Sequence, residues 1–249
     1  MTNKKKKRRL RKEMRIIAFI ILGLIVLIGG LVTYQLLSER KPSDRHVIML
    51  DAAHGGDASG YQGLISEDEY NEQVIDALAA MFANDTDYEI LRTRENGQAM
   101  AVSTRVEVIN EARPDLVLSV RCYNNDSPSF DGMKIFAQPA GSKYHKDSAA
   151  FAGLIDAAFQ EQGVASTAGY YYFHPIKAGY FQDHLVPLED ETDYGEATYD
   201  LMAANAPVVI CAEFNVDSEY DTELWASEDG IATAAKLYYT AIKAMFEKN

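Results

Sequence analysis

The sequence predicts one α/β domain, with a mostly parallel, twisted sheet and helices on both faces, preceded by one transmembrane helix. Three continuous apolar segments have the length and composition of buried strands, at residues 46–51, 115–121 and 207–213. Segments with apolar residues at helical spacing alternate with them. Because parallel strands joined by helices are covered on both faces, they are apolar along their whole length. A separate uncharged run near the N-terminus predicts the membrane helix.

The membrane helix is expected at residues 16–37. These 22 residues carry no charge, and a helix of that length crosses a hydrocarbon core of roughly 30 Å. Residues 1–15 hold nine Lys or Arg and one Glu, which keeps that end in the cytoplasm by the positive-inside rule. A signal peptide has a shorter apolar region followed by a small-residue cleavage site, which this segment lacks. We therefore expect a single-pass protein of the cell membrane, with a polar linker at 38–45 and an extracytoplasmic domain at 46–249.

The charge of that domain excludes one class of partner. The whole chain has a net charge of −13, and with +8 in residues 1–15 the remainder carries −21. Nucleic-acid affinity comes mainly from basic groups that neutralise phosphates, so no nucleic-acid partner is expected. Two cysteines, Cys122 and Cys211, are too few for a disulfide framework. They can form one bridge, but their apolar surroundings favour small core residues.

The remaining elements are predicted in chain order. Ser66 stands three residues before Glu69, the spacing of a capping box, and apolar residues at helical spacing follow, so a helix is expected over 67–84. Further on we expect a strand at 88–93, a helix at 103–112, a strand at 132–139 and a helix at 148–162. Ser227 is expected to cap a C-terminal helix that runs to about residue 247. Residues 163–205 give no clear assignment.

Polar side chains stand where the predicted strands end. His54 follows the first strand, Arg121 closes the second and Glu213 closes the third, while Glu67 begins the helix after the first loop. In open α/β sheets, ligand sites gather at the carboxyl ends of the strands. Each residue alone is as well explained by a helix cap, a solvated loop or a structural ion pair. Their shared position favours a site.

A series of motifs extends from about residue 46 to residue 219. In order they are Asp51-Ala52-Ala53-His54-Gly55-Gly56, Gly60-Tyr61-Gln62-Gly63, Glu67 with Asn71, Thr93-Arg94-Glu95 with Arg105 and Asn110, Pro114-Asp115 ahead of Ser119-Val120-Arg121, and the strand ending at Glu213. This series resembles the zinc-dependent N-acetylmuramoyl-L-alanine amidases. These enzymes cleave the bond between the lactyl group of muramic acid and L-alanine in peptidoglycan. The resemblance implies that peptidoglycan is the partner of the domain.

The resemblance also implies roles for individual residues. The family binds Zn²⁺ through a His, a Glu and a second His, with water in the fourth position, and a further Glu acts as general base. Carried over to this chain, His54 and Glu67 are zinc ligands and Glu213 is the general base. Three protein ligands and an open position suit hydrolysis, because a zinc-bound water loses its proton easily.

The chain departs from the family at the third ligand, where it has Arg121. A guanidinium stays protonated and offers no lone pair to a metal. Three hypotheses are open. In the first, another side chain completes the zinc site, with His174 the first candidate and His184 and His145 behind it. In the second, zinc is bound weakly and activity is low. In the third, zinc is absent and Arg121 is the local cation, which leaves a peptidoglycan-binding or regulatory module. In a catalytic domain, Arg121 is expected to polarise the scissile carbonyl.

Two segments carry weaker functional hypotheses. The acidic run at 189–196 contains enough carboxylates to suggest calcium, but it lacks the alternation and glycine of an EF-hand loop. We therefore expect a solvated acidic loop. The aromatic run at 170–173 offers faces on which sugar rings stack, although packing against the domain explains it at least as well.

Overall fold

The computed structural model describes residues 45–124, 133–138, 142–162, 170–172, 174–176, 179–181 and 201–247, together with Met14, Ile21 and Gly23. The chain divides into two units, Met1–Asp44 and Arg45–Asn249. The three described residues of the first unit are helical. Apart from these and Arg45, the predicted basic segment, membrane helix at 16–37 and linker at 38–45 lie outside the described residues. Within the part of the chain that the structure describes, no helix has the length and apolarity that a membrane span requires.

The second unit is built on a six-stranded sheet with the order β2-β1-β3-β8-β4-β5. Its strands are β1 (His46–Ala52), β2 (Tyr88–Arg92), β3 (Leu116–Tyr123), β4 (Lys134–Ala137), β5 (Tyr170–Tyr172) and β8 (Val208–Asn215). Neighbouring strands are parallel except for β4 and β8, which pair antiparallel. A separate antiparallel pair is formed by β6 (His174–Ile176) and β7 (Gly179–Phe181). The prediction of a mostly parallel sheet is confirmed.

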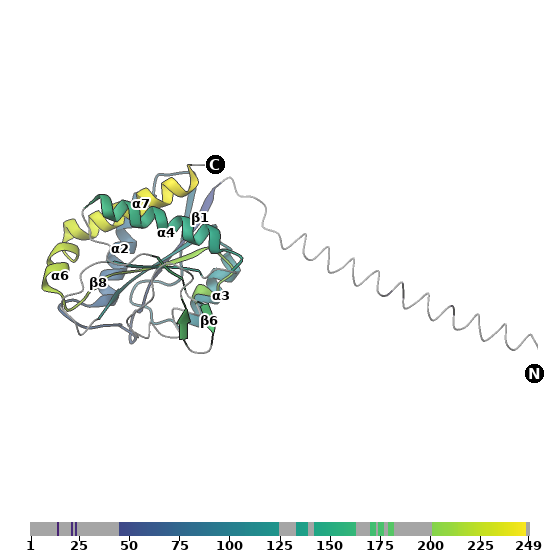
Figure 1. Ribbon diagram of the computed structural model, residues 1–249, viewed down its shortest axis with the longest axis horizontal. Coiled ribbons are helices and arrows are strands. Elements are labelled where there is room, and N and C mark those ends of the chain that lie inside the picture. The colour runs from purple at the N-terminus through teal and green to yellow at the C-terminus, as the bar shows by residue number, and fades with distance from the viewer. Residues whose placement is uncertain are drawn as a thin grey trace, which may run out of the picture. The chain divides into compact units, whose positions relative to one another are not determined.

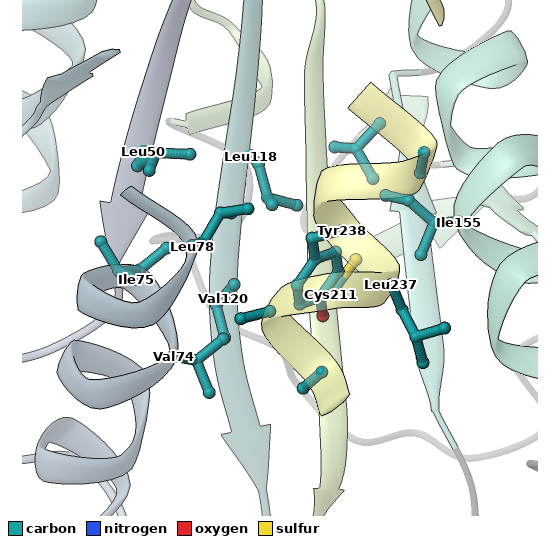
Figure 2. Close-up of a cluster of buried hydrophobic side chains, with 14 of the residues drawn as sticks. Leu50, Val74, Ile75, Leu78, Leu118, Val120, Ile155, Cys211, Leu237 and Tyr238 are labelled. Carbon is teal, nitrogen blue, oxygen red and sulfur yellow. The ribbon is translucent and has the colours of Figure 1, made fainter. Parts of the chain in front are cut away.

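Helices cover both faces of this sheet, as predicted (Figure 1). One face packs against α2 (Glu67–Met81), α4 (His145–Glu161) and α7 (Glu228–Phe246). Figure 2 shows this core, in which Leu118 and Val120 of β3 meet Leu78 of α2 and Tyr238 of α7. The other face packs against α3 (Val102–Ala112), through Ile109 and its neighbours. The short helix α6 (Glu219–Trp225) adjoins α7.

Two helix starts differ from the sequence prediction. Ser66 is the N-cap residue of α2, but its hydroxyl makes no capping bond and donates to Asp68 instead. The predicted capping box is therefore wrong, although the helix begins where it was expected. Helix α4 begins at His145, three residues before Ser148. The Ser148 hydroxyl accepts from the backbone of Gln138 and donates to that of Val208, so it joins strands rather than capping a helix.

Strands β3 and β8 continue two residues beyond the predicted ends, and β8 contains a bulge. Arg121 pairs with Ala212, whereas Tyr123 pairs with Asn215, so two steps along β3 match three along β8. An extra residue reverses the face toward which the following side chains point. Ala212 consequently packs on the α3 face, while Phe214 lies on the α2 face with its ring 4.8 Å from that of Tyr70.

Candidate active site

The loop after β1 presents His54 in a strained conformation. His54 has a φ of 65° and is followed by Gly55 and Gly56, which also have positive φ. A left-handed conformation costs a non-glycine residue roughly 1 kcal/mol or more, so the surrounding structure must enforce it. Ala53, just before it, is held through both of its backbone polar groups. Its amide donates to Val120 of β3 at 3.0 Å, and its carbonyl accepts from the Asn71 side chain of α2 at 3.1 Å.

Glu67, the first residue of α2, lies fully buried beside this loop. One carboxylate oxygen accepts the backbone N–H of Cys122 at 2.9 Å, and the other accepts that of Tyr61 at 2.9 Å. The second oxygen also lies 3.5 Å from Nε2 of His54. Gly60 makes this packing possible, because a Cβ there would lie 2.7 Å from the His54 ring and still closer to Glu67. The prediction that His54 and Glu67 lie together is therefore consistent with the fold.

Arg121 supplies the positive charge of the site. It is 9% exposed and lies on the same face of β3 as Ser119. Burial lowers the pKa of Arg121, and the negative charge of Glu67 opposes that shift. Burial raises the pKa of Glu67, against the two backbone donors and the charge of Arg121. An arginine side chain stays protonated in proteins, so the guanidinium is the cation of the site.

Burial and the neighbouring arginines keep His54 neutral. Burial, followed by the charges of Arg121 and Arg105, lowers the pKa of His54 to about 4. At neutral pH the imidazole is therefore uncharged, and its 3.5 Å contact with Glu67 is not an ion pair. Among the described residues, Arg121 rather than His54 is therefore the cation near the carboxylate of Glu67.

A fully buried ion pair supports the site from the α3 face. Asp51 accepts from Arg105 at 3.0 Å, from Thr93 at 2.6 Å and from Ser119 at 2.6 Å. Burial raises the pKa of Asp51, but the charge of Arg105 and these hydrogen bonds outweigh it, so the net shift is downward. The pair ties β1 to β3 and α3 just below the loop that carries His54.

Glu213 lies apart from these residues. Its carboxylate accepts from the hydroxyls of Tyr70 and Tyr238, the second at 2.7 Å, on the face of the sheet that α2 and α7 cover. The residue of β8 that pairs with Arg121 is Ala212. The structure therefore brings together His54, Glu67 and Arg121, and turns Glu213 toward the core. The role of Glu213 as a general base stays a prediction.

The histidines considered as substitute ligands do not extend this group within the described residues. His145 begins α4, with Nδ1 2.8 Å from the carbonyl oxygen of Gln138. His174 lies in β6, and its side chain, like the whole of His184, lies outside the described part of the chain. Across the described ranges, no three His, Cys, Asp or Glu side chains gather in a way that holds a metal ion. Cys122 and Cys211 are buried and free, as predicted.

Comparison with known proteins identifies the family. The sequence profile of the N-acetylmuramoyl-L-alanine amidases matches residues 48–244. The chain belongs to the N-acetylmuramoyl-L-alanine amidase family. This family acts on peptidoglycan, and its chemistry is hydrolysis of an amide bond. No curated protein sequence matches the chain.

Solved amidase structures share the fold. The catalytic domain of CwlV from Bacillus (Paenibacillus) polymyxa is 17% identical, with a TM-score of 0.65 over 82% of this chain and 99% of that one. An amidase from Clostridium difficile 630 is 12% identical, with a TM-score of 0.67 over 83% and 100%. AmiC2 of Nostoc punctiforme is 16% identical, with a TM-score of 0.62 over 83% and 99%. At these identities the likeness establishes the fold.

The described residues do not fit the zinc site that the amidase family implies. His54 and Glu67 are suitable donors, since neutral imidazole and carboxylate both bind zinc. At the position that the resemblance gives to the third ligand stands Arg121, whose guanidinium offers no lone pair and carries a positive charge. Two donors and a fixed cation do not make a three-ligand zinc site. Sequence reasoning found all three residues but missed Ala212, Tyr70 and Tyr238.

Proposed function

We propose that this amidase-family domain binds peptidoglycan without zinc, at the junction between the muramoyl sugar and the stem peptide. The observation that carries the proposal is Arg121 beside Glu67, where the family would have its third zinc ligand. The shared fold and family membership support peptidoglycan as the ligand. We also propose that residues 16–37 anchor the domain at the outer side of the cell membrane, next to the cell wall, because that segment is long, uncharged and preceded by basic residues.

Arg121 has the chemistry to recognise the junction. A guanidinium donates several hydrogen bonds in a fixed plane and binds carbonyl and carboxylate oxygens well. In a buried position these charge-assisted bonds are stronger than in water. His54, which is uncharged at neutral pH, adds a hydrogen-bonding group beside it. The arrangement can hold and orient an amide, but it provides no activated water, and Glu213 is turned away from it.

A second function is supported by the retained pair of His54 and Glu67. In this alternative, a residue from the undescribed part of the chain, with His174 the first candidate, completes a zinc site and the domain hydrolyses the lactyl–L-alanine amide. Zinc would then supply the activated water. Glu67 would keep its two backbone hydrogen bonds and hold the ligand geometry.

The two functions are separated by zinc content and ligand binding, measured on the full chain in detergent. We expect no zinc above that of the Glu67→Ala variant, no amide cleavage, and retention on insoluble peptidoglycan and on a muramoyl-peptide matrix. Arg121→Ala should weaken binding by about tenfold or more, the effect of losing a charged hydrogen-bonding partner. Arg45→Ala is the matched control, because Arg45 pairs with Glu89 at 3.0 Å at the start of β1.

About one zinc per chain, lost in Glu67→Ala and accompanied by cleavage, would overturn the metal-free proposal and establish the second function. Arg121→His gives a further check. If the missing ligand alone separates the chain from a zinc enzyme, this variant should gain zinc that the natural chain does not hold. Unchanged peptidoglycan retention in Arg121→Ala would remove Arg121 from the binding site.

A further inference from the structure

We propose that Glu213 is a positioning residue, which fixes the first turn of α2, and with it Glu67, through hydrogen bonds from Tyr70 and Tyr238. The inference rests on the proposed function only in taking Glu67 as part of the ligand-binding site. Glu213 and Tyr70 are each 3% exposed and Tyr238 is fully buried, so no substrate reaches this carboxylate in the folded domain.

The two tyrosines saturate the carboxylate from two different helices. Tyr70 of α2 donates to one oxygen and Tyr238 of α7 donates to the other. Together with β8, which carries Glu213, this joins three elements at one buried point. A polar group buried in an apolar core needs such partners, because an unsatisfied one costs about 1–3 kcal/mol. Alternation along β8 places Glu213 on the same face as Val209 and Cys211. The bulge then brings Phe214 to that face as well, where it packs edge-on against Tyr70.

One route from this point to Glu67 runs along α2. Tyr70 lies three residues after Glu67, and residues at that spacing are neighbours on the same side of a helix. The next residue, Asn71, donates to the carbonyl of Ala53, directly before His54. Holding Tyr70 therefore holds the helix turn that sets the positions of both Glu67 and the His54 loop.

A second route runs through Cys122 of β3. Its backbone N–H donates to Glu67 at 2.9 Å. Its thiol lies 4.0 Å from Oδ1 of Asn71 on α2, and burial, followed by the negative charges of Glu67 and Glu213, raises the pKa of Cys122. Glu67 is thus tied to the sheet by a residue of β3 that also contacts α2 one position after Tyr70. Both routes predict that loss of the Glu213 carboxylate loosens the contacts of Glu67 before those of the distant strands.

Hydrogen exchange of backbone amides on the full chain in detergent tests this without any ligand. The reporters are the amides of Tyr61 and Cys122, which donate to Glu67. The reference is the set of amides in β2, which pairs with β1 away from β8. Glu213→Ala should raise exchange at both reporters by on the order of tenfold, relative to β2. Tyr70→Phe should act in the same direction.

Two variants control for a merely structural effect. Glu213→Gln should restore protection at the reporters, because its amide oxygen accepts from one tyrosine and its amide nitrogen donates to the other. Tyr239→Phe removes a hydroxyl from the partly exposed neighbouring position of α7 and should leave the reporters unchanged. The inference is overturned if Glu213→Ala leaves both reporters protected, if β2 loses protection equally, or if Glu213→Gln behaves like Glu213→Ala. None of these outcomes depends on peptidoglycan binding, so they leave the proposed function untouched.

Discussion

Replacing Glu213 with Gln should change how the stability of the domain depends on pH. Burial raises the pKa of Glu213 from 4.5 to about 7, although the hydrogen bonds from Tyr70 and Tyr238 act in the opposite direction. In the unfolded chain the same carboxyl titrates near its ordinary value. Between these two values the folded domain holds a proton that the unfolded chain releases. The contribution of neutral Glu213 to stability is therefore fully present below about pH 4.5 and is lost as the pH rises through 7.

The size of the effect follows from the difference between the two pKa values. They differ by about 2.5 units, and each unit is worth about 1.4 kcal/mol, so the loss reaches about 3 kcal/mol above pH 7. Gln is neutral at every pH and suffers no such loss. The unfolding free energy of Glu213→Gln minus that of the natural chain should therefore increase by about 3 kcal/mol from pH 4.5 to pH 8. Other titrating groups are common to both proteins and cancel in this difference.

Urea denaturation followed by circular dichroism, at several pH values between these limits, measures that difference. Glu223→Gln is a suitable control, because Glu223 is an exposed carboxylate on α6 and its replacement should leave the difference flat. A flat difference for Glu213→Gln as well would refute the reasoning. It would mean that Glu213 is ionised in the folded domain at neutral pH, with its two tyrosine bonds fully offsetting burial.

Three further changes have expected outcomes. Gly60→Ala should weaken peptidoglycan retention and expose the loop to proteolysis, because φ is +73° and a Cβ would crowd His54 and Glu67. Asp51→Asn should lower the unfolding free energy by about 3–5 kcal/mol in urea denaturation, since it leaves Arg105 buried without its carboxylate; a loss below about 1 kcal/mol would contradict this. The two cysteines should not react with a thiol reagent in the folded domain and should react once urea unfolds it, because burial raises the pKa of both thiols; rapid labelling of the native chain would show that they are accessible.

The sequence was sufficient for the main features of the fold. The stretches 47–50, 116–118 and 208–212 are apolar throughout, and each lies in a strand that is buried on both faces. The rule that sites form at the carboxyl ends of parallel strands correctly brought together His54, Glu67 and Arg121. It worked because β1 and β3 are neighbours in register, with Ala52 beside Val120.

The direction of Glu213 could not be predicted in the same way. Every residue from 208 to 215 is buried, so no alternation of apolar and polar residues indicates which side chain faces which layer. Glu213 takes the same face as Cys211, and one extra residue in β8 then brings Phe214 to that face as well. A bulge of this kind has no strong sequence signal when neither Gly nor Pro marks it. The hydroxyls that donate to Glu213 belong to Tyr70 and Tyr238, which are 168 residues apart, so no local sequence pattern links them.

The charges of the site explain why an arginine can stand where a metal ligand is expected. Glu67 is buried and accepts two backbone hydrogen bonds, an arrangement that still needs a nearby positive charge to keep it ionised. In a zinc site the metal would supply that charge. The other neighbour of the carboxylate, His54, is neutral and cannot supply it. Arg121 supplies it permanently and within the chain, so the site is electrostatically complete without a metal. The same charge opposes the approach of a divalent cation. Arg121 at the predicted third-ligand position and the presence of Glu67 are therefore consistent with each other and with the metal-free binding that we propose.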